Sequence, residues 1–382
     1  MSAEILKYGM VGGGPGAFIG EVHRTAARFD GKNILTAGSF SRDYQKTLKT
    51  GKDLGIDENR LYKNYTEMAE KESELADGID FVSVVTPNHT HFEVAEAFLS
   101  QGISVVCDKP VTTSSQEASK LKQLAEKNDA EFCVTYTYSG YPMVKEAKEL
   151  VEKGEIGDIR VIMGEYPQEW LAEPTEEENK QASWRTDPNQ AGISNCIGDI
   201  GSHIEHTVSY ISGLEISKLS ANLDTFVAGR ELDDNGEVMI KYENGATGMY
   251  WASQVAVGND NGLKVRIFGS KGSLEWSQEN PNYLYFSKLG EATKILSRGH
   301  GYLGNEAQKS NRIPPGHPEG YFEAFANIYA NFSAALLEKK KKGKIEEQDF
   351  DYPTITEGLR GVKFIEKCVA SSQQGASWVD FE

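Results

Sequence analysis

LKYGMVGGGPGAFIG, residues Leu6 to Gly20, is an apolar run that ends in glycines and passes directly into an amphipathic helix. Gly12, Gly14 and Ala17 fit the G-x-G-x-x-G/A spacing of a dinucleotide-binding turn. Gly12 permits a tight turn, Gly14 lets backbone N–H groups approach a pyrophosphate, and a small residue at 17 lets the helix pack on its strand. The helix N-terminus adds partial positive charge for the phosphates. This stretch therefore predicts a nucleotide-binding strand–turn–helix unit.

The glycine motif can be aligned with the sequence in a second way, because Gly16 and Gly20 are further glycines a few positions later. We count Gly16 among the expected cofactor contacts together with Gly12, Gly14 and Ala17. The alternative is a glycine-rich turn that binds nothing. Its place after a strand and before a helix favours the cofactor.

Composition narrows the class of protein. A chain of 382 residues with 39% hydrophobic residues suits two globular domains. The net charge of −17 argues against nucleic acid or an anionic membrane as a partner. We find no apolar run as long as a membrane span, and the four cysteines are far apart in the sequence. We therefore expect reduced thiols in a cytoplasmic protein.

The first part of the chain, residues 1–138, alternates apolar segments with amphipathic helices, which predicts a parallel sheet covered on both faces. Together with the glycine turn, this pattern predicts a doubly wound Rossmann domain. The expected strands are Leu6–Val11, Ile34–Phe40, Phe81–Val85, Ser104–Cys107 and Glu131–Tyr136.

The second part, residues 139–382, changes to short strand-like runs joined by turns, of which Asn244-Gly245 is the strongest hairpin signal. We expect an α/β domain with a large, mostly antiparallel open sheet. The outer face of such a sheet needs a cover, and a second subunit commonly supplies it. This predicts a homodimer or homotetramer that assembles through the C-terminal sheet.

The end of the second strand bears on the choice of cofactor. An NAD site usually places Asp or Glu there for the ribose hydroxyls, but this chain has Ser41-Arg42-Asp43. A hydroxyl and a guanidinium suit a 2′-phosphate. Asp43 could instead bind the ribose or cap the next helix. Both NAD and NADP remain open, with a slight preference for NADP.

Two further polar clusters follow predicted strands. Thr86-Pro87-Asn88 and Asp108-Lys109-Pro110 come at carboxyl ends, where doubly wound folds bind ligands. Lys109 would point into the same crevice as the glycine turn. Two histidines separated by one residue, His89 and His91, do not by themselves make a metal site, so we predict no metal.

Asp199 and His203 form a second group of candidate catalytic residues, later in the sequence. On a helix, they lie one turn apart on the same face. The alternative is a helix N-cap and a buried structural histidine.

Taken together, these motifs resemble the Gfo/Idh/MocA family of oxidoreductases over nearly the whole chain, and the subset containing levoglucosan dehydrogenase looks similar. The resemblance implies a Rossmann domain, a tightly held nicotinamide cofactor, and sugars or cyclitols as substrates. It assigns catalysis to Lys109, Asp199 and His203. It extends the cofactor contacts to Ser41, Arg42, Thr86, Asn88, Asp108, Lys109 and Trp184, and the substrate contacts to Arg185, Asp199 and His203.

The chain departs from the family pattern at two places. Asp108 stands where the family commonly has Glu, and Tyr138–Tyr141 stand where an arginine often precedes Pro142. The polar insertion at 169–189 would shape the pocket in a way that the sequence does not specify.

These residue types suit the oxidation of a secondary alcohol. His203 would accept the hydroxyl proton, Lys109 would stabilise the developing oxyanion, and Asp199 would hold His203 or a neighbouring substrate hydroxyl. The alternatives are a regulatory protein that binds the cofactor without turnover, a glycoside-cleaving enzyme that works by transient oxidation, and a metal-dependent isomerase that also uses His206.

Overall fold

The computed structural model describes residues 5–345 and 350–382, and it divides into two compact units. The first unit comprises residues 1–137 and 321–359, and the second comprises residues 138–320 and 360–382. This division differs from the sequence-predicted domains, 1–138 and 139–382, in one respect. The described residues of the segment 321–359 pack with the first unit, because apolar side chains such as Phe325 and Phe332 join its core.

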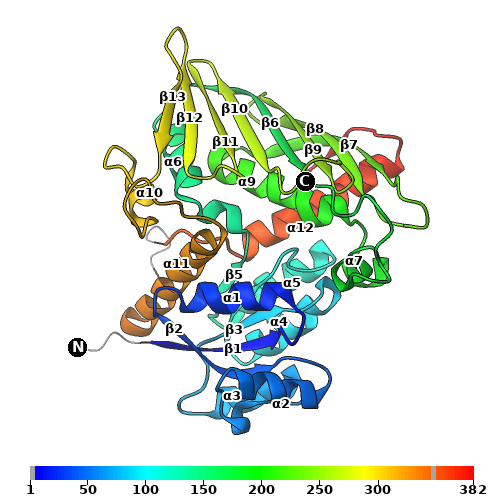
Figure 1. The fold of residues 1–382 in the computed structure, drawn as a ribbon, viewed down its shortest axis with the longest axis vertical. Coiled ribbons are helices and arrows are strands. Elements are labelled where there is room, and N and C mark those ends of the chain that lie inside the picture. Colours follow the sequence, from blue (N-terminus) through cyan, green and yellow to red (C-terminus); the bar gives the residue numbers. More distant parts are fainter. Residues whose placement is uncertain (1–4, 346–349) are drawn as a thin grey trace. The chain divides into compact units, whose positions relative to one another are not determined.

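The first unit is built on a five-stranded parallel sheet with the order β2-β1-β3-β4-β5 (Figure 1). The predicted doubly wound sheet is therefore confirmed. Its strands are β1 (Leu6–Gly12), β2 (Asn33–Ser39), β3 (Phe81–Val85), β4 (Ser104–Cys107) and β5 (Phe132–Val134). Its helices are α1 (Phe18–Arg28), α2 (Tyr44–Asp53), η1 (Glu58–Arg60), α3 (Tyr65–Glu74), η2 (Asn88–Thr90), α4 (His91–Ser100), α5 (Ser115–Lys127) and α11 (Tyr321–Lys342).

Helix α11 is buried against the first unit through an aromatic face. Phe325, Tyr329 and Phe332 are all 1% exposed or less and share one hydrophobic core with Phe81 of β3. The hydroxyl of Tyr329 lies 2.7 Å from His23 Nδ1 on α1 and 2.8 Å from the Ser83 hydroxyl on β3. A helix late in the sequence thus completes the covering of the N-terminal sheet.

The second unit is built on a nine-stranded sheet in which only β6 and β9 pair in parallel. The expected mostly antiparallel sheet is therefore confirmed. In sheet order its strands are β13 (Lys294–Ser297), β12 (Tyr283–Lys288), β11 (Gly272–Ser277), β10 (Lys264–Gly269), β6 (Ile159–Pro167), β9 (Thr247–Ser253), β8 (Asn235–Tyr242), β7 (Ile216–Asp224) and β14 (Val379–Asp380).

Helices lie along one face of this sheet (Figure 1). They are α6 (Pro142–Glu152), α9 (Ser202–Ser212) and the part of α12 (Ile355–Gln373) that belongs to the second unit. Smaller elements are η3 (Thr137–Gly140), at the boundary between the units, and in the second unit α7 (Lys180–Arg185), α8 (Pro188–Ala191), the π-helical turn η4 (Ile197–Gly201) and α10 (Asn305–Lys309).

Helix α9 approaches the sheet closely and is joined to α12 by an ion pair. A Cβ at Gly164 of β6 would lie 2.3 Å from Ile204 Cγ2 of α9, so a larger residue there would displace the Ile204 side chain or the helix. On α9, the carboxylate of Glu205 accepts a hydrogen bond from Arg360 Nε of α12 at 2.6 Å. Glu205 is buried, and the ion pair with Arg360 compensates its charge.

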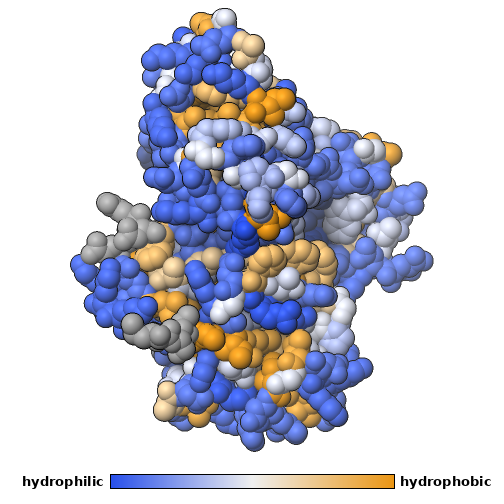
Figure 2. All heavy atoms as spheres, turned by 60° about the vertical axis from the view of Figure 1, so that its left-hand side comes forward, coloured by the Kyte–Doolittle hydropathy of each residue, from blue (hydrophilic) through white to orange (hydrophobic). Residues whose placement is uncertain are grey.

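Polar residues cover much of the surface. The face drawn in Figure 2 is mostly hydrophilic, with apolar side chains gathered in patches. The four cysteines are free thiols and all are buried. Within the described residues, none of the helices is long and apolar enough to cross a membrane.

The buried His23 makes the stability of the first unit depend on pH. Burial lowers the pKa of His23 to about 4. The unfolded state, in which the pKa is about 6.5, therefore binds more protons between these values. We expect the free energy of unfolding to fall by about 2 kcal/mol from His23 alone between pH 7 and pH 5.

His23→Asn keeps a polar group beside Tyr329 but cannot titrate, so it should remove this part of the pH dependence. Denaturant unfolding at several pH values measures the effect, with His300→Asn, at an exposed histidine, as the control. An unchanged pH dependence in His23→Asn would contradict the assignment.

Candidate active site

The glycine turn connects β1 to α1 at the carboxyl edge of the parallel sheet. Gly12 and Gly16 have φ values of +88° and +78°, which residues with side chains rarely adopt. A Cβ at Gly14 would lie 2.7 Å from the carbonyl oxygen of Phe40, so the second glycine of the motif also cannot be replaced without a clash. The turn is therefore bare backbone that leads into a helix N-terminus.

The packing role that the sequence suggests for residue 17 belongs to Gly20. Ala17 is the N-cap of α1 with extended backbone. A Cβ at Gly20 would lie 2.4 Å from Gly13 Cα, so the helix passes the turn too closely for a side chain at this position. This corrects the register of the motif: the helix begins later than the six-residue spacing suggests, because Pro15 and Gly16 lengthen the turn.

The turn after β3 meets the turn after β1 at the topological switch point, since Gly12 pairs with Val85 in the sheet. Thr86 follows Val85 directly. Its hydroxyl is buried and has no hydrogen-bond partner among the residues that the structure describes. Asn88 is buried close by in the sequence, at the start of η2.

The turn after β4 carries Lys109 and is held by the residues around it. The Lys109–Pro110 peptide is cis, and Lys109 is half-buried. Asp108 Oδ1 accepts hydrogen bonds from the Lys109 backbone N–H at 2.9 Å and from the Thr135 hydroxyl at 3.0 Å. The shorter acid at position 108 thus shapes the backbone on which Lys109 stands.

His91 links the same two turns. Its Nδ1 lies 2.8 Å from the carbonyl oxygen of Pro110 and its Nε2 lies 2.8 Å from that of Thr86. The side chain is 1% exposed, and burial lowers its pKa. This histidine therefore braces the strand ends that carry the predicted cofactor contacts.

The three polar residues after β2 differ in their contacts. Asp43 Oδ1 caps α2 by accepting the Gln45 backbone N–H at 3.0 Å, which agrees with the cap alternative. Ser41 lies in the turn, where its hydroxyl accepts the Asp43 N–H at 3.1 Å. Arg42 between them is exposed.

These residues fit a nicotinamide dinucleotide. The bare glycine turn gives close access to backbone N–H groups, the helix N-terminus favours phosphate, and the buried Thr86 hydroxyl can take a partner. When bound, the cofactor supplies the acceptor or donor of a hydride.

The second unit carries the other predicted catalytic residues. Asp199 lies in the π-helical turn η4, and His203 lies in the first turn of α9. Single-turn π segments occur frequently at functional sites. Asp233 fixes the start of this helix by accepting the backbone N–H groups of Asn195 at 2.9 Å and Ile197 at 2.8 Å.

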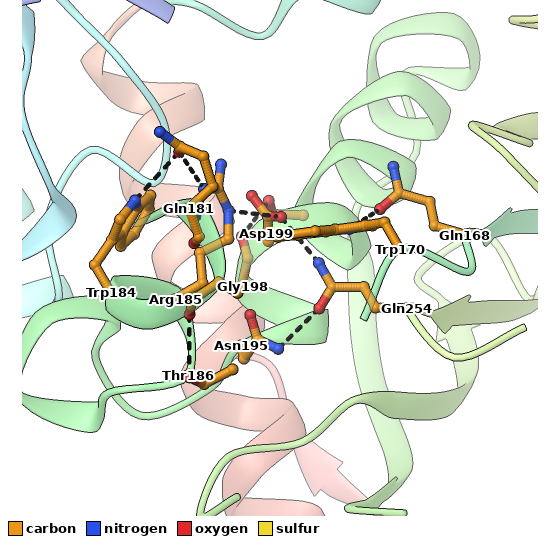
Figure 3. A network of polar contacts seen from close by, with 12 residues as sticks. Gln168, Trp170, Gln181, Trp184, Arg185, Thr186, Asn195, Gly198, Asp199 and Gln254 are labelled. Carbon is orange, nitrogen blue, oxygen red and sulfur yellow. Dashed lines mark hydrogen bonds and ion pairs between the residues drawn. The ribbon is translucent and has the colours of Figure 1, made fainter. Parts of the chain in front are cut away.

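Asp199 belongs to the network drawn in Figure 3. Its Oδ2 accepts hydrogen bonds from Arg185 Nε at 3.1 Å and from Gln254 Nε2 at 3.0 Å. The guanidinium carbon of Arg185 lies 4.3 Å from the ring centroid of Trp184 and 5.7 Å from that of Trp170. The structure therefore brings Trp184, Arg185 and Asp199 together, which sequence spacing alone does not indicate.

His203 is buried against tyrosines. The ring of Tyr138 meets it edge-on with centroids 4.7 Å apart, and the Tyr138 hydroxyl lies 2.5 Å from that of Tyr166. Burial raises the pKa of Tyr138, so its hydroxyl stays protonated near neutral pH. Tyr138, from the segment that departs from the family pattern, thus gives His203 a neutral aromatic contact.

Sequence reasoning missed four polar partners in this unit. Gln254, Asn195, Gln168 and Trp170 come from three separate stretches, and no motif marks them. They are recognisable only because Asn195 Nδ2 donates to Gln254 Oε1 at 2.8 Å and Trp170 Nε1 donates to Gln168 Oε1 at 2.9 Å (Figure 3).

Glu205 and His206 of α9, beside the predicted catalytic His203, have contacts within the protein. Glu205 is paired with Arg360, and the ring of His206 stacks with Tyr210 at a centroid distance of 6.3 Å. Among residues 5–345 and 350–382, no three His, Cys, Asp or Glu side chains are grouped so that they could hold a metal ion.

Comparison with known proteins matches both parts of the chain to family models. Residues 6–136 match the oxidoreductase family with an NAD-binding Rossmann fold, and residues 144–275 match the GFO/IDH/MocA C-terminal domain. YfiI of Bacillus subtilis, an uncharacterized oxidoreductase, is 38% identical over 381 residues, which cover 99% of this chain and 97% of YfiI. The chain belongs to the Gfo/Idh/MocA family of oxidoreductases.

This Gfo/Idh/MocA oxidoreductase is similar to an inositol dehydrogenase homolog from Azotobacter vinelandii along its full length. The complex of that protein with NAD⁺ superposes with a TM-score of 0.96 at 38% identity and covers 99% of this chain and 98% of that one. Its complex with NADH and myo-inositol gives 0.93 at 36% identity, with the same coverage. Levoglucosan dehydrogenase of Pseudarthrobacter phenanthrenivorans is 26% identical over 403 residues, covering 98% of each chain.

The resemblance expected from the motifs is thus confirmed, as is the prediction of an NAD(P)-dependent oxidoreductase. The predicted site residues divide between the units. The glycine turn, Ser41, Arg42, Thr86, Asn88, Asp108 and Lys109 belong to the first unit, and Trp184, Arg185, Asp199 and His203 belong to the second.

Proposed function

We propose that this enzyme transfers a hydride between a nicotinamide cofactor and a secondary hydroxyl of an uncharged sugar, anhydrosugar or cyclitol. The full-length likeness to a protein that was solved with NADH and myo-inositol carries this proposal. The levoglucosan dehydrogenase relative supports the same substrate class. An uncharged substrate is further supported by Arg185, whose charge is already paired with Asp199.

In the proposed mechanism three side chains act on the substrate. His203 accepts the proton of the reacting hydroxyl, because an imidazole titrates near working pH. Lys109 stabilises the negative charge that develops on the oxygen. Asp199 accepts a hydrogen bond from a neighbouring hydroxyl and so orients the ring.

For the cofactor we propose NAD or NADP, with a preference for NADP. Arg42 is exposed beside Ser41 and supplies a guanidinium of the kind that binds a 2′-phosphate. Asp43, the carboxylate that would favour the ribose of NAD, is engaged in capping α2. The complexes of relatives with NAD⁺ and NADH make NAD the competing choice.

Turnover with NAD and NADP against a panel of inositols, hexoses, anhydrosugars and glycosides tests the function. We expect NAD(P)H absorbance to accumulate with at least one polyol, and kcat/KM to be higher with NADP. A higher value with NAD would reverse the cofactor preference. Cleavage of a glycoside without net NADH would favour the glycoside-cleaving alternative, and no turnover on the whole panel would contradict the proposal.

Substitution tests the catalytic assignments. We expect Lys109→Ala and His203→Ala each to lower kcat by about two to four orders of magnitude, because each removes a group that acts in the transition state. Cofactor affinity, followed by fluorescence, should stay largely intact. Lys153→Met, at an exposed ion pair with Glu149, and His300→Ala are the controls. A near-normal kcat in either variant would refute the role of that residue.

We also propose a homodimer or homotetramer that uses the uncovered face of the nine-stranded sheet. Met239 and Met249 are 46% and 43% exposed, and they are register partners on adjacent strands. Met163 pairs with Met249 from the other side, so the three form a continuous apolar row. A row of this kind on a sheet face is typical of a contact between subunits.

A charge in this row should therefore weaken the assembly. We expect Met249→Lys to lower the molar mass measured by light scattering coupled to size exclusion, while Lys153→Met leaves it unchanged. A monomeric wild-type protein at micromolar concentration would contradict the proposed assembly.

A further inference from the structure

The carboxylate of Asp199 is bound by two donors on one oxygen. Arg185 Nε and Gln254 Nε2 lie 3.1 and 3.0 Å from Oδ2 (Figure 3). The side chains of Arg185 and Asp199 are 22% and 17% exposed, so water screens this ion pair only in part. Because an arginine is always protonated and both partners donate, this arrangement favours the ionised carboxylate in one orientation.

Both donors are themselves fixed by further contacts. Arg185 Nη1 donates to Gln181 Oε1 at 2.8 Å, and the guanidinium lies over the rings of Trp184 and Trp170. The buried Gln254 accepts a hydrogen bond from Asn195, which orients its amide so that the NH₂ group faces Asp199. The donors therefore reach Asp199 in a prearranged geometry.

The insertion at 169–189 supplies most of this support. It carries Trp170 and Arg185, and its opposite end is anchored by Arg230, which donates to Glu176 Oε1 and to the carbonyl oxygen of Leu171, both at 2.6 Å. The segment is thus tied to the sheet domain at one end by Arg230 and at the other by the Arg185–Asp199 pair.

We infer that Arg185 is a positioning residue, which keeps Asp199 ionised and oriented as a hydrogen-bond acceptor for a substrate hydroxyl. This inference rests on the proposed polyol dehydrogenase function. It leaves the proton transfer to His203, and it gives the insertion a function: the insertion delivers the guanidinium and both aromatic rings over which it lies.

Kinetics of Arg185→Met and Arg185→Lys test the inference. A hydrogen bond to a charged group is worth about a tenfold to hundredfold change in binding. We expect Arg185→Met to raise the KM for the polyol at least about tenfold, with a smaller effect on kcat and none on the KM for the cofactor. Arg185→Lys should recover part of the loss, and ethylguanidinium added to Arg185→Ala should recover activity. Lys153→Met is the matched control for the loss of an exposed ion-paired cation.

Two results would overturn the inference while the proposed function stands: an unchanged polyol KM in an active Arg185→Met enzyme, or equal increases in both KM values. The latter would indicate a merely structural role.

If the wild type turns over no polyol, the proposed function fails. A thermal-unfolding cycle of Arg185→Met and Asp199→Asn then tests the pair by itself. Shifts that are not additive support the pairing, and additive shifts overturn it.

Discussion

Close backbone approach at glycines is the constraint on which both units depend. In the second unit, α9 can lie directly on β6 because Gly164 has no side chain to meet Ile204. In the first unit, α1 reaches the turn after β1 because Gly20 and Gly13 face each other with no Cβ between them. Each contact fixes the depth of a helix relative to its sheet. A glycine without a side chain therefore places the helix that carries His203. A second pair of glycines places the helix that follows the dinucleotide-binding turn.

Three acidic side chains of the second unit have hydrogen-bond or ion-pair partners within the protein. Asp233 accepts two backbone N–H groups at the start of the helical segment that carries Asp199 and His203, although burial raises its pKa. Glu205 pairs with Arg360, and Asp199 pairs with Arg185. A buried charge without a partner costs several kcal/mol, and each of these carboxylates accepts hydrogen bonds from another segment of the chain. These contacts hold the backbone of the segment that carries Asp199 and His203, and they hold the Asp199 side chain as well.

Much of the fold could be predicted because its signals are local. The apolar segments at Phe81–Val85 and Ser104–Cys107 are strands with those bounds, and Asn244-Gly245 turns the chain between β8 and β9. Two strands escaped prediction, β13 and β14, because each is short and weakly apolar. The packing of α11 with the first unit also escaped, since an amphipathic helix does not reveal which sheet will bury Phe325 and Phe332.

The sequence by itself determined the chemistry that is available: a glycine turn after a strand, a lysine before Pro110, and an acid and a histidine one helical turn apart. These are relations between near neighbours, and backbone geometry fixes them within a few residues. Only the tertiary structure decided that Gly20 and not Ala17 packs against the turn, that Asp43 is a helix cap, and that Asp199 is held by Arg185 and Gln254. The two donors to Asp199 lie 14 and 55 residues away along the chain, and the roles of Asp43 and Gly20 depend on where a helix begins. Hydrophobic periodicity carries no information about either.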